Sequence, residues 1–351
     1  MTVPLIAGGK GMYNYCTLFD SNYLIRGLAM YNSLKENSEN FHLYVFSFDE
    51  LSDKILKELN LENLTVISLK EFENKELLKV KSGRTPGEYC WTSTPLTILY
   101  CIEKYKLEFC TYVDADIYFF SNPEILIEEM VENSNSILLT EHRYTKIYNQ
   151  ETTSGKYCVQ FMTFKNDKRG LKALNWWKDQ CLKWCYARVE NGKFGDQKYL
   201  DDWKERFEGV HILGNLGGGV APWNVQQYKI EKINNNKILL NEKANNNNFE
   251  LIFYHFHNFK VYNNNFLDLG TYKYDSEFKE SVYNIYLLDL ERIKEELSNK
   301  NFKYKFDYSK KLKMKERIKR LLQSIKKCIR NKTIKYYSYN IYKITVFAKK
   351  N

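Results

Sequence analysis

Two aspartates separated by one alanine, Asp114 and Asp116, end an apolar stretch of the sequence that reads TYVDADIYFF. If the strand continues through them, both carboxylates point to one side and Ala115 points to the other. Carboxylates held this close repel each other unless something positive joins them. A divalent cation does so, usually together with substrate phosphates. The spacing therefore predicts a divalent-metal site, with two exposed acids in a turn as the alternative.

A second group of candidate ligands lies in FYHFHNFK (253–260). His255 and His257 share one side of a predicted strand, and Lys260 follows them. A single histidine in such a run is most often a hydrogen-bonded core residue, but two beside a predicted metal site favour ligation. We therefore expect one of these imidazoles to join the two aspartates.

Four further stretches carry polar or aromatic side chains of kinds found in binding sites. They contain Asp20 and Asn22, then Arg84, then Asp196 and Gln197, and finally Trp223 and Asn224 behind the glycines of GGGVAPWN. Each also has a plainer interpretation: a helix cap, an exposed arginine, or a glycine-rich turn.

The elements that must position these residues alternate between strand and helix. Apolar runs predict strands over 13–19, 41–48, 64–69, 109–113, 157–164 and 250–259, and a hairpin over 228–241. Helical spacing predicts helices over 22–37, 51–61, 91–106 and 168–192, and Asn-rich residues 245–248 read as a surface loop. This alternation predicts an α/β fold with a mostly parallel sheet, whose carboxyl edge is the usual place for a ligand.

With these residues identified, the sequence resembles the nucleotide-sugar glycosyltransferases of the GT-A fold. Within them it is most similar to the retaining group that includes glycogenin and bacterial lipooligosaccharide galactosyltransferases. TYVDADIYFFSNPE is similar to that group's D-x-D segment, and stretches 16–34, 194–203, 217–228 and 253–260 follow its order. The resemblance spans residues 12–265 and implies a GT-A (Rossmann-like), mostly parallel sheet flanked by helices. The residues after it predict, by their own pattern, a basic helical C-terminal tail.

The resemblance also implies a role for each candidate residue. Asp114, Asp116 and His255 would bind the metal, with His257 as the rival ligand. The donor nucleotide-sugar would contact Asp20, Asn22, Arg84, Asp114, Ala115, Asp116 and Lys260. Asp196 and Gln197 would be catalytic beneath the sugar, and Trp223 and Asn224 would lie on the acceptor side. Asn258 replaces a glycine of the family, which is a mild change because asparagine tolerates a left-handed backbone.

The sequence departs from the family in two places. Cys158, Val159 and Gln160 stand where the family has an Asn-Ala-Gly stretch that contacts the sugar, and no Lys-Pro-Trp ending follows Lys260. The donor sugar is therefore left open.

The net charge of +10 is concentrated in the tail. Residues 301–351 carry a net +15, so the rest of the chain carries −5, which argues against a body that grips nucleic acid. Segment 308–330 is basic and amphipathic, and 336–347 is rich in tyrosine and phenylalanine. Such a tail is typical of an anchor on an anionic membrane surface, with a solvated or RNA-binding tail as the alternative.

Composition narrows the class of protein further. There is no apolar run long enough to span a bilayer, no convincing secretory signal, and no paired metal-finger spacing among the eight cysteines. We expect a reduced, cytoplasmic protein on the inner face of the membrane. Its predicted parts are a GT-A catalytic domain over 1–270, a C-terminal helix over 271–300 that packs on or near it, and the basic aromatic tail over 301–351.

The sequence thus predicts a metal-dependent transferase that moves sugar from a nucleotide-diphosphate sugar, UDP-sugar favoured, to a glycan or lipid-linked acceptor. The resemblance implies retention of configuration and a role in surface polysaccharide synthesis. An imidazole ligand favours Mn²⁺ over Mg²⁺. Two alternatives stay open. One is a sugar-nucleotide pyrophosphorylase, although IAGGKG (6–11) lacks that class's phosphate loop. The other is a non-catalytic membrane- or RNA-binding adaptor.

Overall fold

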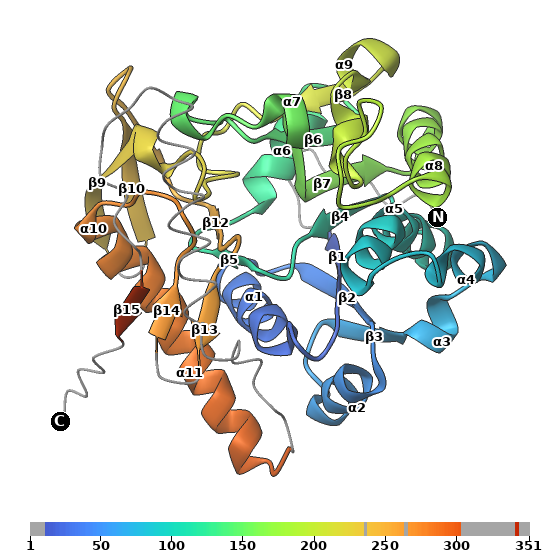
Figure 1. The fold of residues 1–351 in the computed structure, drawn as a ribbon, viewed down its shortest axis with the longest axis horizontal. Helices are drawn as coiled ribbons and strands as arrows, with labels where there is room; N and C mark the ends of the chain where they lie inside the picture. The colour runs from blue at the N-terminus through green and yellow to red at the C-terminus, as the bar shows by residue number, and fades with distance from the viewer. Residues whose placement is uncertain (1–10, 235–236, 263–265, 303–340, 344–351) are drawn as a thin grey trace.

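The structure is a computed structural model that describes residues 11–234, 237–262, 266–302 and 341–343 (Figure 1). The basic segment 308–330 lies outside the described residues, and so does most of the aromatic segment 336–347. The membrane anchor predicted for this tail therefore stays a prediction.

Seven strands form the central sheet: β1 (Tyr13–Phe19), β2 (Phe41–Ser47), β3 (Leu64–Ser68), β4 (Phe109–Val113), β6 (Ile137–Glu141), β7 (Tyr157–Lys165) and β8 (Val210–Ile212). Their order is β3-β2-β1-β4-β7-β6-β8. Strand β7 runs against both of its neighbours, and all other neighbouring pairs are parallel. The predicted α/β fold with a mostly parallel sheet is confirmed.

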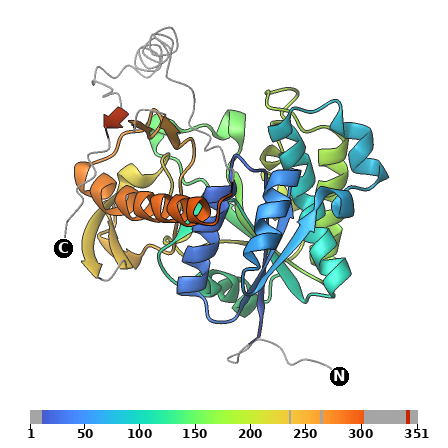
Figure 2. The ribbon, with the colours of Figure 1, turned by 90° about the horizontal axis from the view of Figure 1, so that it is seen from below.

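Helices cover both faces of this sheet (Figure 2). One apolar cluster joins the sheet to α1 (Leu24–Asn37), α2 (Glu50–Leu59) and α6 (Glu124–Glu132). Another joins it to α5 (Pro86–Tyr105) and α8 (Lys168–Lys183). The predicted apolar face of the first helix is buried as expected, at Leu24, Leu28, Tyr31 and Leu34. Because both faces are covered, the central strands are apolar on both sides.

Short helical segments complete the connections between these elements. They are α3 (Leu69–Phe72), α4 (Lys75–Lys81), η1 (Lys146–Tyr148), α7 (Glu151–Ser154), η2 (Gln197–Leu200), α9 (Trp203–Arg206), η3 (Val225–Gln227), α10 (Ser276–Phe278) and the π-helical turn η4 (Lys279–Tyr283).

The strand order reverses at β1. Strands β2 and β3 lie on one side of β1, and β4 lies on the other. In open α/β sheets such a reversal leaves a crevice at the carboxyl ends of the strands, and ligands bind there. Asp20 follows the carboxyl end of β1 and Asp114 follows that of β4. The fold therefore brings two of the predicted polar stretches to one edge of the sheet.

Smaller sheets extend the molecule beyond this edge. Strands β5 (Ile117–Phe119) and β12 (Phe253–His255) form an antiparallel pair. Strands β9 (Tyr228–Asn234), β10 (Lys237–Glu242) and β11 (Asn247–Glu250) form a second sheet that contains the predicted hairpin. A third sheet contains β13 (Lys260–Tyr262), β14 (Phe266–Asp268) and β15 (Ile341–Lys343).

Three predicted boundaries are wrong. The helix expected over 91–106 begins at Pro86, because Thr85 and Glu88 form a capping box before it. The helix expected over 168–192 ends at Lys183, because Trp184 is extended and residue 192 belongs to a separate turn. The strand expected over 250–259 is divided between β11 and β12, and β11 includes part of the loop expected at 245–248 because its backbone pairs with β10.

The last long helix packs against the strand pair β5–β12. Helix α11 (Asn284–Asn299) contributes Tyr286, whose ring stacks on Phe256 with 3.8 Å between centroids and meets Tyr118 edge-on at 5.6 Å. Aromatic contacts of these geometries add to the stability gained from burial. Within the part of the chain that the structure describes, no helix combines the length and apolar character needed to cross a bilayer.

Two helical glycines give a matched test of this packing. A Cβ added at Gly170, in α8, would collide with the backbone carbonyl of Lys165, whereas one added at Gly87, in α5, would meet nothing within 4 Å. Gly170→Ala should therefore lower the free energy of unfolding by about 1–3 kcal/mol. Gly87→Ala should raise it by about 0.5 kcal/mol, because alanine restricts the unfolded chain more than glycine does. Urea denaturation measures both, and equal effects of the two variants would contradict the packing of α8 on β7.

Candidate active site

Asp114 and Asp116 lie in a turn that follows β4. Strand β4 ends at Val113, and the amide of Ile117 donates to the carbonyl of Asp114 at 3.2 Å. The prediction that a continuous strand aligns the two carboxylates is therefore wrong. The turn nevertheless leaves both side chains accessible, at 29% and 15% exposure, while Ala115 is buried.

Pairing of β5 with β12 brings His255 to these acids, because His255 lies opposite Ile117 in the antiparallel register. Its Nε2 is 3.2 Å from Oδ1 of Asp116 and 3.8 Å from Oδ2 of Asp114. One potential ligand atom from each residue lies within 4.8 Å of the others. We call Asp114, Asp116 and His255 the Asp-His cluster.

His257 takes a different place. It is partly exposed, and its Nε2 accepts a hydrogen bond from the side-chain amide of Asn258 at 2.8 Å. Among the described residues, the group at this turn that could hold a metal ion includes His255 and not His257. Asn258 has a φ of 59°, so it adopts the left-handed conformation expected of it.

The charges of the Asp-His cluster are interdependent. Burial raises the pKa of Asp114, and the nearby charge of Asp116 contributes, so that it reaches about 6. Burial also acts on Asp116, but the His255 ring outweighs it and lowers the pKa of Asp116 to about 2. Burial disfavours a charged ring at His255, yet the Asp116 carboxylate raises the pKa of His255 well above its ordinary value. Without a bound ion, the imidazolium therefore serves as the counter-charge to the acids.

Residues before and within α1 face the same region. Asp20 accepts hydrogen bonds from the backbone amide of Asn22 at 3.0 Å and from its side-chain amide at 2.9 Å. Neither residue caps α1, whose first residue is Leu24 and whose N-cap makes no side-chain bond. The charge of Asp116 is the largest cause of the raised pKa of Tyr23, which is about 12, so this exposed ring lies near the Asp-His cluster.

Arg26 provides a cation beside the Asp-His cluster that the sequence analysis did not single out. Its guanidinium lies 4.6 Å from the centroid of the Tyr23 ring, and Nη2 donates to the carbonyl of Phe259 at 3.2 Å. Its charge also contributes to the low pKa of Asp116. Lys260, the residue after Phe259, is the first residue of β13 and is partly exposed. An arginine within an otherwise apolar helical face was the available signal.

The Arg84 side chain packs against an aromatic ring. Its guanidinium lies 3.8 Å from the centroid of the Tyr186 ring, and the side chain is partly buried. The plainer interpretation of Arg84 as an exposed arginine is therefore wrong, and its contact with the donor stays a prediction.

Asp196 and Gln197 lie where η2 begins. Burial, and then the charge of Asp114, raise the pKa of Asp196 to about 8. The carbonyl of Asp196 accepts a hydrogen bond from Nε1 of Trp177 at 2.9 Å, and Nε2 of Gln197 donates to the carbonyl of Ser154 at 2.7 Å. Electrostatic coupling thus places Asp196 near the Asp-His cluster, and Gln197 binds the connection between β6 and β7.

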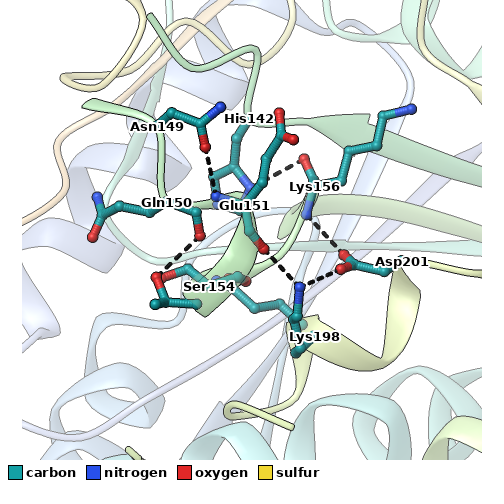
Figure 3. Close-up of polar contacts among 10 residues, drawn as sticks. His142, Asn149, Gln150, Glu151, Ser154, Lys156, Lys198 and Asp201 are labelled. Carbon is teal, nitrogen blue, oxygen red and sulfur yellow. Dashed lines mark hydrogen bonds and ion pairs between the residues drawn. The ribbon is translucent and has the colours of Figure 1, made fainter. Parts of the chain in front are cut away.

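A polar network fixes that connection to η2 (Figure 3). Nζ of Lys198 donates to the carbonyl of Glu151 at 2.6 Å and to the carboxylate of Asp201 at 2.5 Å. The same carboxylate accepts the backbone amide of Lys156 at 2.7 Å. These bonds hold the β6–β7 connection and the segment of Asp196 and Gln197 together as one unit.

The glycine-rich segment 217–224 packs behind His255. The Trp223 ring meets the His255 ring edge-on at 5.4 Å, and its Nε1 donates to the carbonyl of His142 at 2.8 Å. Asn224 is fully buried, and its amide nitrogen donates to the carbonyls of His142 and Gly219. The structure therefore gives Asn224 the task of holding this segment, which differs from the acceptor contact expected of it.

Gln160 is a further residue that the sequence analysis named only as a departure from the family. It is fully buried in β7, and its Oε1 lies 2.7 Å from Nδ1 of His255. A glutamine inside the apolar run YCVQFMTF was the signal, because a buried amide needs a partner.

A second group of metal-ligating atoms lies inside the protein. Cys16, Cys101 and Cys110 come from β1, α5 and β4, and their sulfur atoms lie within 4.8 Å of one another with no exposed surface. They belong to the apolar cluster between the sheet and α5, as expected for small core residues. None of the seven described cysteines forms a disulfide.

The Asp-His cluster has the donor set of a divalent-metal site. Two carboxylates retain exposed surface, and Nε2 of His255 faces both of them. The ion pair between this ring and the two acids lies where an ion would bind. Carboxylate and imidazole together suit Mn²⁺ or Zn²⁺ better than Mg²⁺ or Ca²⁺, which prefer oxygen ligands. The residues present therefore fit a divalent ion.

Comparison with known proteins assigns the chain to a family. No protein-family model matches the sequence. It is 29% identical to YfnD of Bacillus subtilis (strain 168) over 293 residues, which are 82% of this chain and 91% of YfnD. It is 30% identical to YfnF of the same organism over 253 residues, 70% of this chain and 82% of YfnF. The chain belongs to the YfnF family. Both relatives are described as uncharacterized proteins.

Several solved structures that resemble this chain are glycosyltransferases. Mouse xyloside xylosyltransferase 1 is 14% identical, with a TM-score of 0.45 over 71% of this chain and 98% of that one. The glycosyltransferase GlyE of Streptococcus pneumoniae TIGR4 is 14% identical, with a TM-score of 0.39 over 59% and 47% of the two chains. Both scores are below 0.5, so the description of the fold rests on this chain's own sheet.

The buried acid Asp196 gives a pH-dependent prediction for the metal-free protein. Its pKa rises from 3.8 to about 8 on folding, so between these values the folded state binds a proton that the unfolded state has lost. Asp196 therefore lowers stability as pH rises, by up to about 1.4 kcal/mol per pH unit. Asp196→Asn should raise the free energy of unfolding more at pH 8 than at pH 5 in EDTA. A gain that is equal at both values, or larger at pH 5, would contradict this assignment.

The two histidines give a second prediction. His255→Ala should weaken Mn²⁺ binding by about tenfold or more, because it removes a ligand, whereas His257→Ala should change it less than threefold. Electron paramagnetic resonance of free Mn²⁺ measures both affinities. A larger loss at His257 would reverse the assignment of the ligand.

Proposed function

We propose that this chain is a metal-dependent glycosyltransferase that moves a sugar from a nucleotide-diphosphate sugar to a glycan or lipid-linked acceptor. The observation that carries the proposal is the Asp-His cluster at the carboxyl edge of the sheet, next to the reversal of strand order between β1 and β4. An edge of this kind suits a nucleotide, and the cluster suits the ion that accompanies a diphosphate.

In this proposal Asp114, Asp116 and His255 hold the ion, and the imidazole favours Mn²⁺ over Mg²⁺. When bound by these residues, a divalent ion would supply positive charge that offsets the negative charge on the leaving diphosphate. The His255 ring must give up its Nε2 proton to act as a ligand, so metal binding releases a proton.

Other residues of the same edge would bind the donor. Asp20 and Asn22 already form a fixed turn after β1, and we assign the base and ribose to them, with the exposed ring of Tyr23 beside them. Arg26 and Lys260 supply positive charge near the diphosphate. A UDP-sugar is the favoured donor, on the resemblance noted in the sequence.

The sugar would lie toward Asp196 and Gln197. Asp196 is electrostatically coupled to Asp114, and Gln197 is fixed to the β6–β7 connection, so both are held in place before a donor arrives. They would stabilise positive charge that develops at the anomeric carbon, with retention of configuration. Trp223, whose ring packs edge-on against the His255 ring, would lie next to the acceptor.

The setting of the reaction is also part of the proposal. A basic tail on a mildly acidic body suits attachment to the cytoplasmic face of an anionic membrane, where lipid-linked acceptors of surface polysaccharide synthesis are found. The tail carries no catalytic role in this proposal.

The two alternatives make different products. A pyrophosphorylase would release or consume pyrophosphate, whereas a glycosyltransferase releases the nucleoside diphosphate. A non-catalytic adaptor would turn over no nucleotide-sugar at all. The adaptor leaves the proximity of Asp114, Asp116 and His255 without a purpose, whereas a pyrophosphorylase would also use a metal there, so only the product separates it from a glycosyltransferase.

Asp116→Asn tests the proposed function. The change removes one charge from the Asp-His cluster with little change in shape, so Mn²⁺-dependent release of UDP from a panel of UDP-sugars should fall by about 100-fold or more. Asp202→Asn, at a surface ion pair with Arg206, is the matched control and should keep full activity. Full activity of the Asp116 variant, or of the wild-type protein in excess EDTA, would contradict metal-dependent transfer.

A further inference from the structure

Gln160 binds the His255 ring, and the Cys158 thiol is a second polar neighbour of that ring. Gln160 Oε1 lies 2.7 Å from His255 Nδ1, on the side of the ring away from Asp114 and Asp116. An amide oxygen can only accept, so the ring must carry its proton at Nδ1 for this bond to form. The second ring nitrogen, Nε2, then points its lone pair toward the carboxylates once its own proton is lost.

This bond decides which nitrogen can bind an ion. With the proton fixed at Nδ1, Nε2 is the free donor, and Nε2 is the atom 3.2 Å from Asp116. The opposite tautomer would carry its proton at Nε2 and would leave Gln160 Oε1 without a donor in a fully buried place. An unpaired buried acceptor costs about 1–3 kcal/mol, so with the Gln160 amide oriented as in the structure, the ring keeps its Nδ1 proton and loses the Nε2 proton when it binds an ion.

Gln160 is itself fixed by the residues that form the site. The backbone carbonyl of Gln160 accepts a hydrogen bond from the backbone amide of Asp114 at 3.0 Å. This bond continues the pairing of β4 with β7 into the turn that holds Asp114 and Asp116. The register between β6 and β7 shifts between Leu138 and Thr140, opposite this part of β7. Such irregularities redirect a side chain out of the regular alternation of a strand.

The amide end of Gln160 lies against a glycine with a left-handed backbone. Gly219 has a φ of 89°, and a Cβ added there would lie 3.2 Å from Gln160 Nε2. That nitrogen has no hydrogen-bond partner among the described residues. Both N–H donors of this nitrogen are therefore left unpaired, and the hydrogen bond that the side chain does make is to His255.

We propose that Gln160 is a positioning residue that fixes the tautomer and orientation of His255 for metal binding. This inference rests on one part of the proposed function, namely that the Asp-His cluster binds a divalent ion. It gives a task to the stretch in which this chain departs from the family it resembles. An outer partner of a metal-binding histidine typically contributes about 10- to 100-fold in affinity.

Two substitutions separate positioning from simple packing. Gln160→Met has a similar length and volume but accepts no strong hydrogen bond, so it should weaken Mn²⁺ binding by about 10- to 100-fold. Gln160→Glu keeps an acceptor at the same place, so it should bind Mn²⁺ within about threefold of wild type, or more tightly. The matched control is Thr163→Val, also in β7, which removes a buried hydrogen bond between Thr163 and Thr111 of β4. It should leave the affinity unchanged.

The experiment measures the dissociation constant of Mn²⁺ for the full chain by electron paramagnetic resonance, with and without UDP, and checks folding by circular dichroism. Weak binding by the methionine variant together with retained binding by the glutamate variant supports the inference. Wild-type affinity in a folded methionine variant overturns it, and so does equal loss in both variants or the absence of Mn²⁺ binding by the wild type. Mn²⁺ binding without any sugar transfer would overturn the proposed function and leave this inference standing.

Discussion

Mutual repulsion between Asp114 and Asp116 is the constraint on which the rest of the site depends. Both carboxylates lie in one short turn, partly removed from water, where like charges cannot coexist without a counter-charge. In the described structure the His255 ring is that counter-charge. Everything that keeps His255 in place therefore also keeps the two acids ionised, and a divalent ion would relieve the same repulsion more completely.

The support of His255 comes from several distant parts of the chain. Strand pairing fixes its backbone against Ile117, and its amide donates to the carbonyl of Val220 in the glycine-rich segment at 3.0 Å. Trp223 packs against one side of the His255 ring, and Gln160 binds Nδ1 of that ring. Helix α11 stacks Tyr286 on the neighbouring Phe256, so even the C-terminal helix braces this strand. The order of these elements in the sequence gives no direct hint of this convergence.

The sequence predicted the parts of the site that depend on local pattern. The apolar strand before Asp114 follows from a short stretch whose pattern is visible in the letters. The central sheet follows for the same reason, because alternating strands and helices leave few arrangements. The preference for His255 over His257 and the place of Asn258 came from the family resemblance, and the ligand role of His255 stays a prediction. What could not be predicted depends on contacts far apart in the chain. The turn at Asp114–Asp116 is set by β12, and the tasks of Gln160, Arg26 and Asn224 are set by partners from other elements.

Anomalous X-ray diffraction at the manganese edge, from crystals of the full chain soaked with MnCl₂ and UDP, tests the central claim most directly. The account predicts one strong anomalous peak between the carboxylates of Asp114 and Asp116 and Nε2 of His255, with the UDP diphosphate next to it and the uridine toward Asp20 and Asn22. UDP bound at this edge with no manganese peak, or a manganese peak only at another place in the molecule, would contradict it.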